Sequence, residues 1–201
     1  MPRVFRLSPF VLALALTLIS ASAFAAGVDA DQFVKERHVQ LLGLLDQPKS
    51  PAREKKVGTT IDEVFDYAQL AERSLGEEWK NRTDVERLQF RDVLEQLVRK
   101  TYRKSIDSTV GYQVEHRGTQ KSGNDTVVAT VAKHKSDNRK APFTIDYVLV
   151  QVDGKWRAVD VVIEGSSLVG NYRSQFTRVI KKKGFAELLA MMKRKLDKGD
   201  K

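Results

Sequence analysis

The apolar residues in the first half of the chain recur at the spacing of helices. Residues 29–45 carry apolar side chains three and four positions apart, which predicts a helix. The prolines and charges of residues 48–56 predict a connecting loop. A threonine followed by glutamate three positions later has the pattern of a capping box, and it predicts that a second helix begins at Thr60. Gly76 is expected to interrupt that helical stretch. A second capping box at Thr83 predicts the longest helix of the chain, which extends to about residue 106 with one broad apolar face.

After residue 107 the apolar period changes from helical to alternating. Strands are predicted over residues 110–117, 126–133, 143–152 and 156–164. Asp153 and Gly154 form a two-residue hairpin signal, so the strands are expected to form an antiparallel meander. Residues 172–182 and 185–195 return to helical spacing, with Gly184 between them.

Helices first, a sheet next and helices last predict an α+β fold. The sheet is expected to have four strands, with the N- and C-terminal helices packed across one face. On the last strand, Val159, Val161 and Ile163 alternate with other residues and form one apolar face. By itself this pattern indicates an ordinary packed core.

The first residues have the pattern of a secretory signal peptide. Arg3 and Arg6 precede a short apolar run over residues 10–19, and an A-x-A cleavage site follows at residues 23–25. We therefore expect residues 1–25 to be removed, leaving residues 26–201 as a single domain. The alternative is a retained N-terminal anchor, although the apolar run is short for a membrane span.

The formal net charge of +9 falls to +7 when the two arginines of the predicted signal peptide are removed. A basic surface favours anionic partners such as lipid head groups or an acidic protein, and predicted export argues against nucleic acid. The alternative is a basic surface that only confers solubility. The chain has no cysteine, which excludes disulfides, thiol catalysis and thiolate metal ligands.

Signals of catalysis and metal binding are weak. The sequence from Gly165 matches a nucleophile elbow only as far as Val169. His38, His116 and His134 are far apart and lack the spacing of metal ligands, so no metal is expected. An isomerase using a pocket carboxylate such as Asp146 or Asp160 together with Tyr147 is the enzymatic alternative. Neighbouring strand residues such as Asp146 and Tyr147 point to opposite faces, which disfavours it.

The segment 156–189 carries the most specific motif of the chain. It contains a V-D-V-V-I-E-G strand and turn, followed by N-Y-R-S-Q-F at residues 171–176. Further marks lie upstream: Phe65-Asp66, Leu75-Gly76, Trp79, Phe90 and Thr101-Tyr102. Together these motifs closely resemble the MlaC family, also called the toluene-tolerance family, of periplasmic phospholipid-binding proteins. The resemblance covers about residues 57–196.

The resemblance implies an NTF2-like cone with an apolar cavity that carries phospholipid as cargo, with no other cofactor and no catalytic residue. It implies a soluble periplasmic protein, expected to be monomeric, that moves lipid between an outer-membrane lipoprotein–porin complex and an inner-membrane ABC transporter. Two alternatives stay open: a carrier of another lipid such as a hopanoid, and an envelope interaction domain without lipid.

The resemblance also suggests which residues line the cavity. The expected floor and walls are formed by Tyr147, Val159, Val161, Ile163, Leu97, Tyr102, Tyr172 and Phe176. Arg173 is expected to contact the head group or fix the mouth, because a guanidinium matches phosphate oxygens well. Its structural alternative is an ion pair with Asp160 or Glu164.

Overall fold

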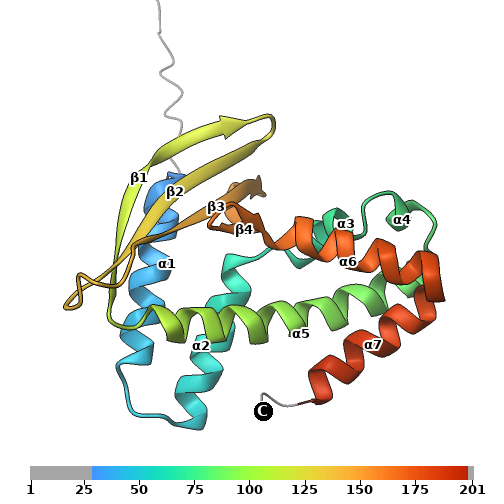
Figure 1. Ribbon diagram of the computed structural model, residues 1–201, viewed down its shortest axis with the longest axis horizontal. Coiled ribbons are helices and arrows are strands. Elements are labelled where there is room, and N and C mark those ends of the chain that lie inside the picture. The colour runs from blue at the N-terminus through green and yellow to red at the C-terminus, as the bar shows by residue number, and fades with distance from the viewer. Residues whose placement is uncertain (1–28, 199–201) are drawn as a thin grey trace, which may run out of the picture.

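The computed structural model describes residues 29–198, which form an α+β fold of seven helices and one five-stranded sheet (Figure 1). The predicted signal peptide lies outside the described residues. The elements are α1 (Ala30–Leu45), α2 (Pro51–Val64), α3 (Tyr67–Leu75), α4 (Glu77–Lys80), α5 (Asp84–Thr109), β1 (Tyr112–Ser122), β2 (Asp125–His134), β3 (Phe143–Val152), β4 (Lys155–Ile163), β5 (Ser166–Ser167), α6 (Leu168–Lys183) and α7 (Phe185–Asp197).

The sheet is an antiparallel meander in the order β1-β2-β3-β4-β5. The predicted hairpin at Asp153-Gly154 is confirmed, with both residues at positive φ. The prediction of four strands is wrong by one. The chain turns back at Glu164-Gly165, again with both φ values positive, and β5 then pairs with the end of β4. A strand of two residues is too short to show an alternating pattern.

The largest error of the sequence analysis concerns residues 48–64. Pro51–Val64 is one continuous helix, where a loop and a helix start at Thr60 were expected. Ser50 caps the helix by accepting a hydrogen bond from the Arg53 amide at 3.2 Å, and proline is favoured at the first helical position because it needs no amide there. Thr60 lies within α2 and its hydroxyl donates to the Lys56 carbonyl at 3.0 Å.

Two predicted helix signals, at Thr83 and Gly76, act as expected. The break between α2 and α3 at Phe65-Asp66 was not predicted, and α6 begins at Leu168 rather than at residue 172. The capping box at Thr83 is present, with the Glu86 carboxylate accepting from the Thr83 amide at 2.8 Å. It opens α5, whose 26 residues end three positions beyond the predicted end. Gly76 ends α3 at a φ of 57°, which glycine adopts without the strain of a side chain.

Helix α5 is the central support of the fold. Figure 1 shows it lying across the molecule, with the sheet toward one end and α7 toward the other. It packs against α1, α2, α3 and α7, while α6 packs against α3 and β4. One apolar cluster connects these elements, and Phe90 at its centre is fully buried and meets the ring of Phe176 edge-on at 5.5 Å.

Two bulges change the register of the sheet. In β1 the pairing with β2 shifts between His116 and Gly118. In β4, Asp160 pairs with Val148 but Ala158 pairs with Leu149, which leaves Val159 as the additional residue. Directly opposed residues of two strands share a face.

Ala158 therefore lies on the same face of the sheet as Val161. The regular alternation that would have placed Val159 on that face is interrupted. Both Ala158 and Val159 are fully buried, but Val159 lies outside the main apolar cluster.

Asp160, beside this bulge, joins the sheet to α6. Its carboxylate accepts hydrogen bonds from the Val169 amide at 3.0 Å and from the Ser167 hydroxyl at 2.5 Å. Ser167 in turn caps α6 by accepting from the Gly170 amide at 2.8 Å. A negative charge at a helix N-terminus is favourable because the amides there are unpaired and the helix dipole is positive. Asp160 therefore acts as a structural cap.

We predict that Asp160→Ala lowers the free energy of unfolding by about 2 kcal/mol, because it removes a charged acceptor from the start of α6. Urea unfolding followed by circular dichroism measures the change. The matched control is Asp92→Ala, which removes a half-exposed carboxylate on α5 that pairs with the neighbouring Arg91. Equal stability losses in the two variants would contradict the capping role.

Candidate functional site

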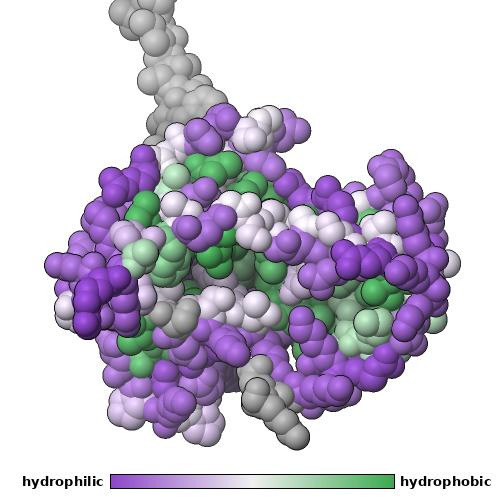
Figure 2. All heavy atoms as spheres, in the orientation of Figure 1, coloured by the Kyte–Doolittle hydropathy of each residue, from purple (hydrophilic) through white to green (hydrophobic). Residues whose placement is uncertain are grey.

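A cavity of about 330 Å³ lies between α5, the sheet and the start of α6. Figure 2 shows hydrophobic side chains in a hollow on this face, surrounded by hydrophilic ones. The apolar and aromatic lining residues come from α5, β3, β4 and α6: Val98, Tyr102, Ile106, Ile145, Tyr147, Val161, Ile163 and Leu168. Such a lining can hold a hydrocarbon chain.

The remaining lining residues are polar: His38, Thr101, Ser105, Thr109, Ser166 and Asn171. Thr101, Ser166 and Asn171 are exposed, and the apolar Ile163 beside them is 39% exposed. Tyr147 and Val161, by contrast, are 6% exposed. The cavity thus has a buried apolar end and a polar, solvent-accessible mouth.

Two tyrosines meet at the buried end. Tyr102 comes from α5 and Tyr147 from β3, and their hydroxyls are hydrogen-bonded to each other. Burial raises the pKa of Tyr102 and of Tyr147, so both stay neutral. Tyr102 also packs edge-on against Phe65 with ring centroids 4.8 Å apart. The buried end therefore carries polar atoms without a charge on either phenol.

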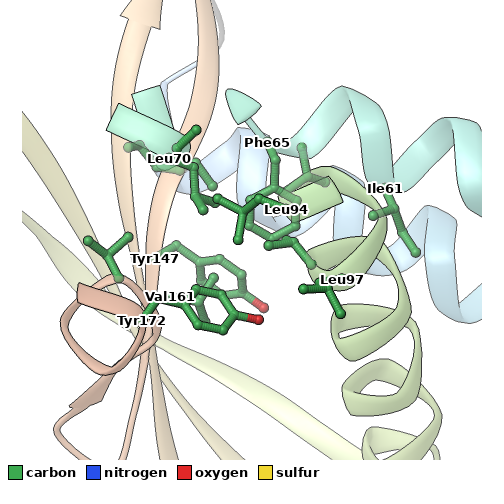
Figure 3. Close-up of a cluster of buried hydrophobic side chains, with 14 of the residues drawn as sticks. Ile61, Phe65, Leu70, Leu94, Leu97, Tyr147, Val161 and Tyr172 are labelled. Carbon is green, nitrogen blue, oxygen red and sulfur yellow. The ribbon is translucent and has the colours of Figure 1, made fainter. Parts of the chain in front are cut away.

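Tyr172, from α6, borders this region without lining the cavity. Figure 3 shows it grouped with Tyr147 and Val161, while Leu94 and Leu97 project from α5. Its side chain hydrogen-bonds Thr101, and its ring stacks on Phe176 at 5.1 Å. Burial raises the pKa of Tyr172. The residue holds α6 against α5 at the mouth.

His38, from α1, is a cavity residue that the sequence analysis missed. Its Nε2 is buried and has no hydrogen-bond partner among residues 29–198. Burial lowers its pKa, and the nearby His116 and Lys135 lower it further. Its place in the helix could have indicated its burial, because His38 lies four residues after Val34 on the buried face of α1.

The structure brings four of the eight predicted lipid-contacting residues to the cavity: Tyr102, Tyr147, Val161 and Ile163. The other four are displaced from it. Leu97 lines a separate groove between α5 and α7, Tyr172 and Phe176 belong to the core beside Phe90, and Val159 is removed by the bulge in β4.

Of the stripe of α5 that faces the cavity, only Tyr102 was predicted from the sequence. Val98, Tyr102, Ile106 and Thr109 recur every three or four residues along it. The broad apolar face of this helix is shared between the core and the cavity. Periodicity alone does not show which of these residues face the core and which face the cavity.

Arg173 lies outside the cavity lining. Its Nε and Nη2 donate to the Arg73 carbonyl at 2.8 and 2.6 Å, which joins α6 to the end of α3. The ion pair considered for it is not formed within residues 29–198. Asp160 caps α6 instead, and Glu164 contacts Thr144. A contact of Arg173 with a head group stays a prediction.

Neither a metal centre nor a membrane span is found within residues 29–198. No three histidine, aspartate or glutamate side chains gather there as a metal-binding group. In the same part of the chain, every helix is too short or too polar to cross a bilayer.

Comparison with known proteins supports the motif-based assignment. The sequence model of the MlaC protein family matches residues 36–194, most of the chain. A solved structure with the same fold is the phospholipid-binding protein from Ralstonia solanacearum in complex with a phospholipid, with a TM-score of 0.71. The two chains are 21% identical, and the match covers 84% of this chain and 97% of the other. The predicted family and the α+β fold are thereby confirmed.

The burial of His38 predicts a pH-dependent stability. Its pKa is lower in the folded state than the usual value of about 6.5, so unfolding takes up a proton as the pH falls below that value. The free energy of unfolding should therefore decrease from about pH 7 to pH 5, by at most about 1.4 kcal/mol per pH unit for this group. Urea midpoints across this range measure the slope.

In His38→Gln, which keeps a polar side chain and removes the titration, the slope should be shallower than in the parent protein. Identical slopes in the two proteins would show that His38 does not resist protonation in the fold.

Proposed function

Because the chain belongs to the MlaC family, we propose that it is a phospholipid carrier of the bacterial periplasm. The observation that carries this proposal is the cavity, whose buried end is lined mainly by apolar and aromatic side chains and whose mouth is polar and open. A lipid bound there places its hydrocarbon in the dry end and leaves its charged group near water, which avoids the cost of burying an unpaired charge. The Ralstonia protein, which shares the fold, was solved with a phospholipid bound.

The family and the structural relative point to a binding and transport protein rather than an enzyme. The side chains support the same conclusion. Asp160, one of the two strand carboxylates considered for catalysis, is engaged as a helix cap, and the phenols of Tyr102 and Tyr147 are held neutral by burial.

A shuttle between two membrane complexes is consistent with the energetics of such a cavity. Burial of one CH₂ group is worth about 0.8 kcal/mol relative to water. A bilayer is already apolar, so transfer from membrane to cavity changes the free energy little. Exchange is then close to balanced and depends on partners that open a path. We infer that those partners are an outer-membrane lipoprotein–porin complex and an inner-membrane ABC transporter, and that the carrier acts as a monomer.

Native mass spectrometry of the protein purified from a bacterial periplasm, with organic extraction of the ligand, tests the proposal. A one-to-one adduct of phospholipid mass is expected. A hopanoid mass would assign a different lipid cargo. A protein that stays free of lipid after incubation with liposomes and a donor partner would overturn the carrier function.

Filling the cavity should expel the lipid. We predict that Val161→Trp lowers the bound phospholipid at least several-fold while the fold is retained, because the new side chain occupies existing space. Lipid per protein after extraction, together with circular dichroism, measures both effects. Val85→Trp, at a 65% exposed position of α5, should leave both unchanged.

Val128→Trp provides the opposite control. Val128, on β2, is fully buried in the main apolar cluster and does not line the cavity. Overpacking there should destabilise the fold by about 1–3 kcal/mol. If Val161→Trp behaves like this variant, with lost stability and unchanged lipid, the assignment of the cavity is wrong.

A further inference from the structure

A second groove, of about 470 Å³, lies between α5 and α7. We call it the cationic groove, because five basic side chains line it and no acidic one does. They are Lys100 and Lys104 from α5, and Arg194, Lys195 and Lys198 from the end of α7. Leu97 and Met191 supply its apolar surface.

Within residues 29–198, the lysines of this groove lack the carboxylate partners that the neighbouring arginines of α5 have. On α5, Arg99 pairs with Asp62 at 2.8 Å, and Arg103 pairs with Glu54 at 3.3 Å. Lys100 has no carboxylate within salt-bridge distance in residues 29–198, and its Nζ lies 3.4 Å from the Lys198 carbonyl.

Lys104, Lys195 and Lys198 likewise have no carboxylate partner in that part of the chain, whereas Arg194 pairs with Glu187 at 2.7 Å. Within residues 29–198, four of the five positive charges of the groove are therefore left without a carboxylate partner.

The groove adjoins the mouth of the cavity at Thr101. Thr101 lines both, and it hydrogen-bonds Tyr172, which holds α6 at the mouth. Along α5, residues 101 and 105 face the cavity while residues 100 and 104 face the groove. These two pairs form adjacent stripes of one helix, because successive residues are rotated by about 100°. A charged group that emerges at Thr101 therefore enters the field of Lys100 and Lys104.

We propose that the cationic groove receives the phosphate and the negatively charged part of the head group of the carried lipid. The protein would then prefer lipids of net negative charge over zwitterionic ones. Lysine ammonium groups bind phosphate as flexible point charges, which suits an open groove. A zwitterionic head group brings its own cation, which the same lysines repel. This inference rests on the proposed function as a phospholipid carrier.

Competitive loading tests the preference. Lipid-free protein is incubated with vesicles that contain phosphatidylglycerol and phosphatidylethanolamine in equal amounts, and the extracted lipids are quantified. Both lipids lie in the same vesicle, so attraction of the protein to the membrane does not bias the ratio. We expect roughly fivefold enrichment of phosphatidylglycerol at low salt, the size expected from two exposed ion pairs. The enrichment should fall at high salt because these charges are screened.

The double variant Lys100→Gln with Lys104→Gln should bring the ratio close to one. The matched control, Lys181→Gln with Lys182→Gln, removes the same charge from the exposed C-terminal end of α6, away from the lining of the groove. It should keep the enrichment of the parent protein.

Each other outcome has a distinct meaning. An unchanged ratio in the groove variant, or an equal loss in the α6 control, would overturn the inference while the carrier function stands. A parent protein that takes up no lipid, even when a donor partner is added, overturns the carrier function instead, and the inference with it. Saturable binding of inorganic phosphate that persists after lipid loading would assign the groove to free phosphate and also overturn the inference.

Discussion

The Asp160 carboxylate sets the angle at which α6 leaves the sheet, and the shape of the cavity depends on that angle. It binds the Ser167 hydroxyl and the Val169 amide, so the first turn of the helix is tied to β4. From that turn the chain places Leu168 and Asn171 at the mouth. Further along, the Arg173 guanidinium fixes the helix to α3. One strand carboxylate thus positions the part of the mouth that α6 contributes.

The features that the sequence predicts well are those that depend on neighbouring residues. The capping box at Thr83 and the turn at Asp153-Gly154 are specified within a few residues, and both form where expected. The start of α2 was misplaced because two start signals compete. The serine and proline at residues 50–51 prevail over Thr60, whose side chain points back into its own helix.

The site itself was only half predictable, because it depends on contacts between distant elements. The bulge at Val159 follows from how β4 pairs with β3, and alternation along one strand gives no sign of it. Leu97 and Val98 are both apolar and adjacent, yet they face different hollows. His38 becomes a cavity residue only when α1 is packed against the sheet. The family motif indicated that a cavity exists but not which stripe of α5 lines it.

The outer edge of β1 has a consequence for how copies of this protein meet. An unpaired edge strand exposes amides and carbonyls that a second chain can join by adding a strand. Here the register shift at His116–Gly118 bends the edge, and Glu115 and Arg117 place charges beside it. A neighbouring copy would have to bury those charges and follow the bend to extend the sheet. The same irregularity therefore protects a crowded solution of the protein against growth into edge-to-edge aggregates.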